Sequence, residues 1–458
     1  MPLAKHLPVV EPQTASKTNT IEQSRYACSL GALTSVLAIP RATPISHCGP
    51  GCASKQYGAL AGINGYQGGD FYVPSTNIGE HEVVFGGVER LDELIDATLK
   101  IMDSDLFVVV TGCVPDLVGD DVQSVLRKYV SRGAPLVLAE TGGFRGNNFT
   151  GHEVITKAII DQFVGPYSGP RDKRLVNVWS LLPYQNTFWR GDLGEIKRLL
   201  EGIGLTVNIL FGAQSKGAPE WKTISKAEFN LVLSPWLGLQ TAQHLEAKYG
   251  QRYLHVPVIP IGANQTSAFL RQVASFGGLE VGSVESFIAA EEEVYYGYLR
   301  DFGTFYSGFT SQYQLPSTAV VVSESAYNLA VTKFLASQLG ILPCRHIITE
   351  NPPEQYRESI RAEYRNLTPT VSTEVDFEED GYRILQKVRQ ADISDQVPIV
   401  FGSTWEGELA KQLGASLVEI GHPATDEVVL SRTNVGYRGA LSFLEKTFTT
   451  VVRASTIS

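Results

Sequence analysis

The chain has 458 residues, of which 43% are hydrophobic and 19% charged, an ordinary composition for a globular protein with buried cores. At about 150 residues per domain, this length predicts roughly three domains. The formal net charge of −10 argues against a nucleic-acid-binding protein, which normally carries a basic face. Residues 1–17 lack a secretory signal pattern, and no apolar run reaches the ~18 residues of a membrane helix, so we expect a soluble, cytoplasmic protein with no nucleic-acid or membrane partner.

Short apolar, β-branched segments alternate with amphipathic helical patterns along the chain. The first group has expected strands at Leu106–Thr111 and Pro135–Ala139 and a helix at Val122–Val130. The second group has expected strands at Arg174–Trp179, Leu205–Phe211, Phe229–Leu233 and Tyr253–Ile259 and a helix at Leu193–Ile203. The third group has expected strands at Thr318–Val322, Arg345–Thr349, Pro398–Phe401 and Ala415–Glu419 and a helix at Ala326–Leu339.

This alternation is typical of parallel sheets covered by helices on both faces. Its threefold occurrence predicts an α/β protein with three Rossmann-like, doubly wound domains. We place them at residues 1–170, including an N-terminal extension, at 171–315 and at 316–458, with a helical bridge at Val284–Leu299. Ligands of such folds bind beyond the carboxyl ends of the strands, where Cys113 follows the expected strand Leu106–Thr111.

The chain contains five cysteines, an odd number that does not indicate a disulfide framework in a protein of this kind. Cys28 lies in YACSLGAL, before an expected helix start. Cys52 lies in SHCGPGCASK, where glycines and proline are expected to prevent regular structure, and Cys48 stands four residues earlier. Cys113 lies in TGCVPDLVGDD. We therefore expect three loop-like segments whose thiols converge.

Soft thiolates select zinc, copper(I) or iron–sulfur clusters. Structural zinc sites use close pairs such as C-x2-C, and the sequence contains none. A cuboidal iron–sulfur cluster normally takes four ligands. Three scattered cysteines therefore predict an incomplete site, finished by Cys48, by another residue type or by a second chain. The alternative is that the cysteines are small buried residues without a ligand.

An ordered set of motifs accompanies these cysteines. It is a cysteine before L-G-A, then H-x-x-x-G-C, F-G-G and T-x-C followed by G-D-D, represented here by Cys28–Ala32, His47–Cys52, Phe85–Gly87 and Thr111–Asp121. Over most of its length the chain resembles the β subunit of nitrogenase component 1 and its nitrogenase-like relatives. Later segments, LSPW at 233–236 and TNVGYRGA at 433–440, also resemble β-type chains. The resemblance implies the nitrogenase component 1 fold.

The resemblance also implies a cofactor and partners. Cys28, Cys52 and Cys113 would ligate half of a P-cluster, an [8Fe-7S] iron–sulfur cluster shared with an α-type subunit in an α2β2 heterotetramer. An ATP-dependent iron protein would deliver electrons, which pass to a second metal centre in the α-type subunit. That centre needs a cysteine in the middle domain, and residues 171–315 contain none. The resemblance therefore implies an electron-relaying oxidoreductase subunit with no catalytic residue of its own.

Departures from the family pattern refine this expectation. Gly143 stands where molybdenum-type β subunits have a serine that ligates the oxidised cluster, and the usual histidine-rich tract near the end is missing. Cys48 replaces a glycine and is a candidate extra ligand or a thiol beside the cluster. These departures favour a methylthio-alkane reductase, which cleaves carbon–sulfur bonds. The alternatives are a true nitrogenase and a cofactor-assembly scaffold of the same fold.

Other motifs favour simpler interpretations. The glycine-rich segment 141–151 lacks the G-K-[ST] ending of a phosphate loop, which disfavours a nucleotide-binding enzyme with inert cysteines. Asp120 and Asp121 are expected at a helix start, where acids suit the helix dipole. Cys344 is interpreted as a core thiol, and His422 is expected in a structural or interface role.

Overall fold

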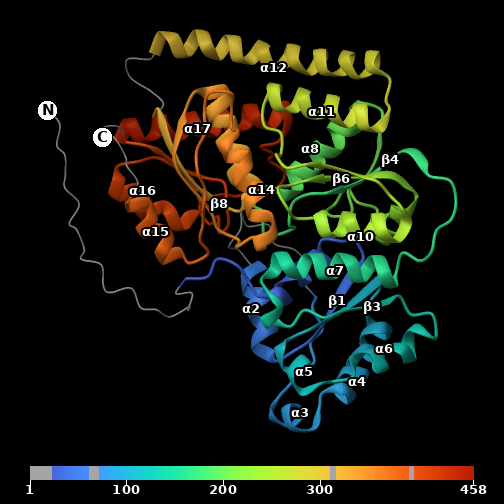
Figure 1. The fold of residues 1–458 in the computed structure, drawn as a ribbon. Coiled ribbons are helices and arrows are strands. Elements are labelled where there is room, and N and C mark those ends of the chain that lie inside the picture. The colour runs from blue at the N-terminus through green and yellow to red at the C-terminus, as the bar shows by residue number, and fades with distance from the viewer. Residues whose placement is uncertain (1–22, 61–71, 310–315, 391–396, 458) are drawn as a thin grey trace.

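The structure is a computed structural model that describes residues 23–60, 72–309, 316–390 and 397–457. The described residues form three parallel sheets, each covered by helices (Figure 1). The predicted α/β fold class is therefore confirmed. The expected N-terminal extension, residues 1–22, lies outside the described residues. Among the described helices, none is long and apolar enough to cross a membrane.

The first sheet has the order β1-β2-β3, with β1 at Ala42–His47, β2 at Leu106–Thr111 and β3 at Leu136–Ala139. Alternate residues of β2 face opposite sides: Val108 and Val110 belong to the main core, whereas Phe107 and Val109 belong to a second apolar cluster. The helical segments of this unit are η1 (Ser29–Ala32), α1 (Leu33–Leu37), α2 (Pro50–Leu60), α3 (Glu80–Phe85), α4 (Val88–Ile101), α5 (Cys113–Val118), α6 (Val122–Val130), η2 (Gly143–Arg145) and α7 (Asn148–Gln162).

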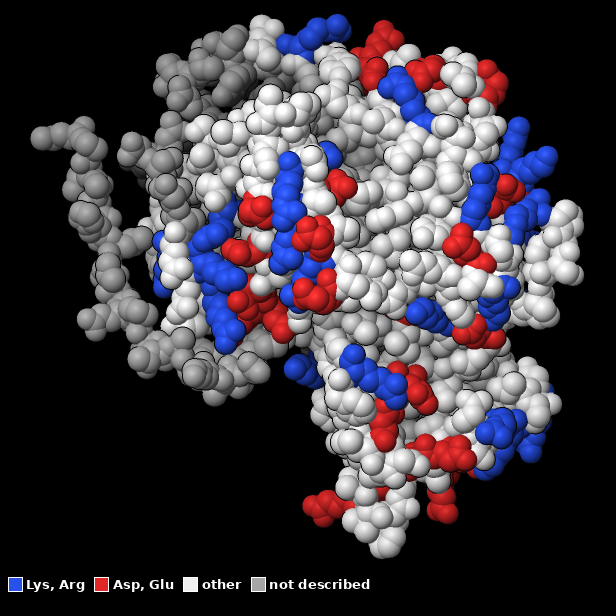
Figure 2. Space-filling view, in the orientation of Figure 1, with Lys and Arg blue, Asp and Glu red and all other residues white. Residues whose placement is uncertain are grey.

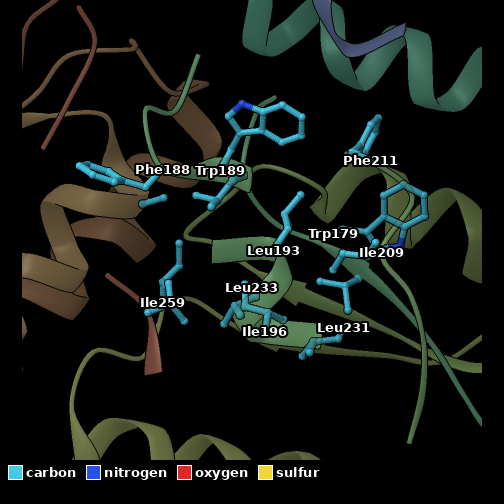
Figure 3. Close-up of a cluster of buried hydrophobic side chains, with 14 of the residues drawn as sticks. Trp179, Phe188, Trp189, Leu193, Ile196, Ile209, Phe211, Leu231, Leu233 and Ile259 are labelled. Atoms are coloured by element: carbon cyan, nitrogen blue, oxygen red, sulfur yellow. The ribbon is translucent and has the colours of Figure 1, made fainter. Parts of the chain in front are cut away.

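The second sheet has the order β5-β4-β6-β7. Its core is rich in aromatic side chains, with Trp179, Phe188, Trp189 and Phe211 gathered among leucine and isoleucine side chains (Figure 3). The strands are β4 (Asp172–Trp179), β5 (Thr206–Asn208), β6 (Ala227–Leu233) and β7 (Tyr253–Val256), and the helices are α8 (Trp189–Gly202), α9 (Ala218–Trp221), η3 (Ile224–Lys226), α10 (Leu239–Tyr249) and α11 (Ala263–Gly277).

The third sheet has the order β10-β9-β8-β11-β12. Its strands are β8 (Thr318–Ser323), β9 (Leu342–Ile348), β10 (Asp376–Phe377), β11 (Ile399–Gly402) and β12 (Leu417–Glu419). Its helical segments are α13 (Ser325–Phe334), a continuation at Leu335–Leu339, α14 (Glu354–Arg365), α15 (Gly381–Arg389), η5 (Thr404–Glu406) and α16 (Gly407–Leu413).

Two long helices join the second and third sheets. The helix α12 (Val281–Phe309) runs across the top of the molecule in Figure 1, where a helical bridge was expected. The C-terminal helix α17 (Gly436–Ile457) follows the third sheet in sequence, yet it also packs against α8, α11 and α12. Because α17 packs on helices of the second unit, the contacts do not separate the domains cleanly. The domain boundaries at residues 171 and 316 stay predictions.

Candidate metal centre

The carboxyl ends of β1 and β2 bring two cysteine segments together. The strands are parallel neighbours in which His47 pairs with Thr111, and the Gly112 N–H donates to the His47 carbonyl at 2.8 Å. Cys48 therefore follows β1 next to the point where Cys113 follows β2. The strand β1 was not predicted from the sequence, because Pro44, Ser46 and His47 weaken its apolar pattern.

The prediction that Cys52 lies in an irregular loop is wrong. Residues Pro50–Leu60 form α2, and Cys52 occupies its first turn. Proline is well tolerated at the first helical position, because its missing N–H would have no partner there. Cys113 is likewise the first residue of α5. Both thiols therefore lie in the first turn of a helix that follows a strand of the first sheet.

The third cysteine segment is held against the glycine-rich loop. Cys28 forms an isolated bridge with Asn147 and precedes η1, so the expected helix start is confirmed. The Ser29 N–H donates to the Gly146 carbonyl at 2.8 Å. These contacts place Cys28 beside η2, which starts at Gly143.

Gly143 lies between two of the thiols. A Cβ built on it would be 2.9 Å from Cys113 Sγ and 3.3 Å from Cys28 Sγ. Its N–H donates to Cys113 Sγ at 3.1 Å. Gly143, which stands in place of the family serine, therefore lies against two of the expected ligand sulfurs.

Cys52 completes the group. Burial raises the pKa of its thiol, and the charges of Cys48, Cys28 and Cys113 raise it further, which shows that the four side chains are close neighbours. Within the described ranges, no three His, Cys, Asp or Glu side chains surround the position of one metal ion. In an iron–sulfur cluster, separate irons take separate thiolates. The thiol donors and the side-chain-free position at Gly143 fit such a cluster.

The four thiols differ in their exposure. Cys28 and Cys52 are exposed and Cys113 is intermediate, whereas Cys48 is only 1% exposed. The three exposed or half-exposed thiols are those expected as ligands from the sequence. The structure therefore separates Cys48 from the other three.

His47 and Asp120 form a buried pair at this edge of the sheet. The two side chains are buried and hydrogen-bonded, with His47 Nε2 and Asp120 Oδ2 3.0 Å apart. Burial lowers the pKa of His47, although the Asp120 charge opposes that shift. Asp120 also accepts the Gly87 N–H at 2.9 Å. Of the two acids, Asp121 has the expected helix-start role, because it is the N-cap of α6. Asp120 instead links the connection between α5 and α6 to His47 of β1 and to Gly87 before α4.

Replacing Asp120 by alanine should lower the free energy of unfolding by about 2 kcal/mol, because hydrogen bonds to a charged group contribute about 1.5–3 kcal/mol. Loss of this carboxylate leaves the buried His47 and Gly87 donors unpaired. Urea unfolding followed by circular dichroism measures the change. Asp103→Ala is the control, since Asp103 is exposed and pairs only with Arg41; equal stability of the two variants would contradict this role.

Exposed apolar side chains lie on α5 and η2, which adjoin the cysteine group, and on α3, which contacts α5. Phe85 of α3, Leu117 of α5 and Phe144 of η2 are 76%, 75% and 61% exposed, and we call these three residues the apolar rim. Next to them, Asp116, Asp121, Glu140 and Arg145 line a hollow of about 200 Å³. Figure 2 shows acidic side chains around this lower part of the molecule, beside a largely uncharged tip. Exposed apolar groups rimmed by polar ones mark interaction surfaces.

A second enclosed space lies where the strand ends of the second and third sheets meet. It measures about 20 Å³ and is lined by Leu181, Trp236 and Glu324 among others. That volume is on the scale of a single water molecule. Burial raises the pKa of Glu324 to about 8, with the Glu350 charge as the next cause, and Asn186 donates to its carboxylate at 2.8 Å.

The raised pKa of Glu324 predicts a pH-dependent stability. The unfolded chain loses this proton near pH 4.5 and the folded chain near pH 8, so stability should fall as pH rises through that window. Glu324→Gln should flatten this fall and raise the thermal midpoint at pH 8. Calorimetry across the window tests it, with Glu354→Gln as the exposed control. An unchanged pH profile in Glu324→Gln would contradict the assignment.

Two further residues are structural. Cys344 is half-buried in β9 and donates its S–H to the Ala319 carbonyl at 3.2 Å, as expected for a core thiol. His422 precedes a cis proline and stacks on Tyr26, and burial lowers its pKa to about 3. The structural part of its expected role is therefore supported.

The structure thus combines three parallel α/β units with a group of free thiols at the edge of the first sheet. Residues 27–452 match the family of nitrogenase component 1 type oxidoreductases. The chain belongs to this family.

Individual relatives share modest identity with the chain. A nitrogenase molybdenum-iron protein β chain from Methanococcus maripaludis is 24% identical, covering 96% of both chains. A light-independent protochlorophyllide reductase chain from Angiopteris evecta is 23% identical over 81% of this chain and 71% of its own. A solved structure titled "Nitrogenase Cp1 at pH 6.5" matches with a TM-score of 0.78 at 19% identity, covering 96% of this chain and 95% of its own. The expected nitrogenase component 1 fold is confirmed.

Proposed function

We propose that the chain is the β-type subunit of the catalytic component of a nitrogenase-like reductase. Cys28, Cys52 and Cys113 hold half of a P-cluster-type [8Fe-7S] cluster, which supplies a relay for electrons. The observation that carries this proposal is the convergence of two thiols on Gly143, with Cys52 close by. Three thiols leave a cuboidal half unfinished, so an α-type subunit supplies the remaining ligands.

The residues of this chain have distinct tasks in that relay. The helix starts of α2 and α5 place Cys52 and Cys113 at the carboxyl-end edge of the first sheet. The Gly143 N–H donates to Cys113 Sγ and stabilises its negative charge. The buried His47–Asp120 pair keeps the ends of β1 and β2 in register. These contacts orient the sulfurs before a cluster binds.

The apolar rim supports a partner at this site. Large exposed side chains on α3, α5 and η2 need a covering surface, and the half-finished ligand set needs the same neighbour. The proposed partners are the α-type subunit in an α2β2 heterotetramer and an ATP-dependent iron protein. The proposed substrate centre lies in the α-type subunit, because residues 171–315 of this chain contain no cysteine to hold a second metal centre.

Leu117→Glu should weaken assembly with the α-type subunit at least tenfold, because a buried charge at an apolar contact costs more than about 1.4 kcal/mol. Leu117 is 75% exposed, so the isolated chain should fold unchanged. Copurification with a tagged α-type subunit and sedimentation measure assembly. Val281→Glu, 71% exposed on α12, is the matched control. Unchanged assembly of Leu117→Glu would show that the apolar rim lies outside the interface.

We further propose that the complex cleaves the carbon–sulfur bond of small methylthio-alkanes. The support is the departure from molybdenum-type chains at Gly143 and Cys48, together with the missing histidine tract. Two electrons and two protons convert ethyl methyl sulfide to ethane and methanethiol. The electrons come from the iron protein.

One activity assay separates the candidate functions. The anaerobically purified complex is supplied with its iron protein, ATP and a low-potential reductant, under argon with ethyl methyl sulfide or under dinitrogen. Ethane with equimolar methanethiol supports the proposal, whereas ammonia identifies a true nitrogenase. Transfer of the cluster to an acceptor without turnover identifies an assembly scaffold. Iron-free protein after anaerobic reconstitution would overturn the whole proposal.

A further inference from the structure

The segment that precedes Cys28 is attached to the third unit, which is built on the third sheet. We call this segment, residues 23–27, the strap. The carbonyl of its first residue accepts the Gly381 N–H at the start of α15 at 3.0 Å. Further along, the Tyr26 hydroxyl lies 2.5 Å from the hydroxyl of Thr349, which follows β9. The strap therefore connects a proposed cluster ligand of the first unit to the third unit.

Arg25 makes the most buried of these attachments. Its side chain is 1% exposed, and that of its ion-pair partner Glu406 in η5 is 0% exposed. Two nitrogens of the guanidinium donate to the Glu406 carboxylate, one of them at 3.1 Å. The guanidinium also donates to Ser403 Oγ at 2.7 Å and lies over the Trp405 ring, 5.1 Å from its centroid. Removing one partner of a buried ion pair is strongly destabilising, because the other charge is left unpaired.

The backbone on both sides of Cys28 is held by the loop before α7. The strap ends at Ala27, whose carbonyl accepts the Asn148 N–H at 3.0 Å. The Asn147 side chain in turn donates to the Glu350 carbonyl of the third unit at 2.6 Å. Cys28 itself is exposed, so packing of its own side chain contributes little to its position. That position depends on the strap and on this loop.

We propose that Arg25 is a positioning residue for the cluster: by fixing the strap to the third unit, it determines where the Cys28 sulfur lies. This inference rests on the proposed function, in which Cys28 is a ligand. Cys113 is held differently, by the end of β2 and by the Gly143 N–H within the first unit. A displaced strap would therefore move the Cys28 sulfur relative to the Cys113 sulfur. Binding sites need their ligands held to within about 0.5 Å by the residues that support them.

Hydrogen exchange of the cluster-free, full-length chain tests the attachment directly. Arg25→Met removes the guanidinium and keeps an apolar side chain. The Ser29 N–H, which donates to the Gly146 carbonyl, should exchange at least tenfold faster, a change of about 1.4 kcal/mol in the free energy of local opening. The Gly112 N–H, which donates to the His47 carbonyl within the first unit, should keep its wild-type rate.

Two further variants separate positioning from general stability. Arg25→Lys keeps a positive charge beside Glu406 and should restore part of the protection at Ser29. Arg198→Met makes the same chemical change in an ion pair with Glu291 that joins α8 to α12, and it should leave exchange at Ser29 unchanged. In the loaded complex, a chelator should remove iron sooner from Arg25→Met than from Arg198→Met.

Each other outcome contradicts the inference. Wild-type exchange at Ser29 in Arg25→Met would show that the strap does not depend on Arg25. Faster exchange with unchanged iron retention would show that the strap is only structural. If Arg25→Met fails to fold, the double variant Arg25→Met/Glu406→Gln avoids an unpaired buried charge, and the same results are expected of it. A wild-type complex without iron would instead overturn the proposed function, whereas the exchange result in the cluster-free chain would stand.

Discussion

Replacing Cys113 by alanine should deprive the complex of most of the cluster iron that this chain binds. Cys113 is the first residue of α5, directly beyond β2, and its sulfur accepts the Gly143 N–H at 3.1 Å. Losing even a hydrogen-bond partner of a metal ligand lowers metal affinity by about 10–100-fold. Loss of the ligand itself should exceed that range. Iron analysis and the visible spectrum of the anaerobic complex measure the effect.

The control is Cys344→Ala, which removes a thiol in the third sheet that donates to the Ala319 carbonyl. It should retain wild-type iron and colour. Cys28→Ala and Cys52→Ala should resemble Cys113→Ala, because all three thiols belong to one group. Full iron in the Cys113 variant would show that Cys113 is not a cluster ligand and would contradict the proposed ligand set.

Much of the fold could be predicted because the central strands are apolar throughout. Leu106–Thr111 and Val122–Val130 were predicted with the ends that the structure has. Such strands are buried on both faces, so nearly every residue is apolar and the strand is visible as a continuous hydrophobic run in the sequence. The strand β1 was missed because Pro44, Ser46 and His47 interrupt the pattern. Packing of α17 on α8, α11 and α12 depends on distant contacts that no local pattern contains.

The candidate site was partly predictable for a related reason. Cysteines are few, so their order along the chain was informative, and the strand end before Cys113 indicated where they meet. The helix containing Cys52 was missed because Gly49, Pro50 and Gly51 were interpreted as helix breakers, whereas proline suits a first helical turn. The contacts of Asp120 and the burial of Cys48 arise from tertiary packing. Only the structure distinguishes these residues from their sequence neighbours.

Gly143→Ala should weaken cluster binding, because the added methyl group enters the space that Gly143 leaves beside two of the proposed ligand sulfurs. The added methyl group would lie 2.9 Å from Cys113 Sγ and 3.3 Å from Cys28 Sγ, closer than ordinary contacts. In the cluster-free chain, the thiols can rotate away at little cost. Once a cluster holds both sulfurs, they can no longer rotate away from the methyl group. Iron content during titration with a chelator measures the loss.

The Gly143→Ala substitution should therefore affect cluster loading more than folding of the chain. Thermal unfolding of the cluster-free Gly143→Ala chain should differ little from wild type, while the loaded complex should lose iron to the chelator sooner. Gly297→Ala is the matched control, because its added Cβ on α12 would meet no packed neighbour within 4 Å among the described residues. That variant should keep its iron and gain slight stability, by about 0.4–1 kcal/mol. Equal iron retention in the two variants would show that the cluster does not lie beside Gly143. That result would contradict the proposed ligand set.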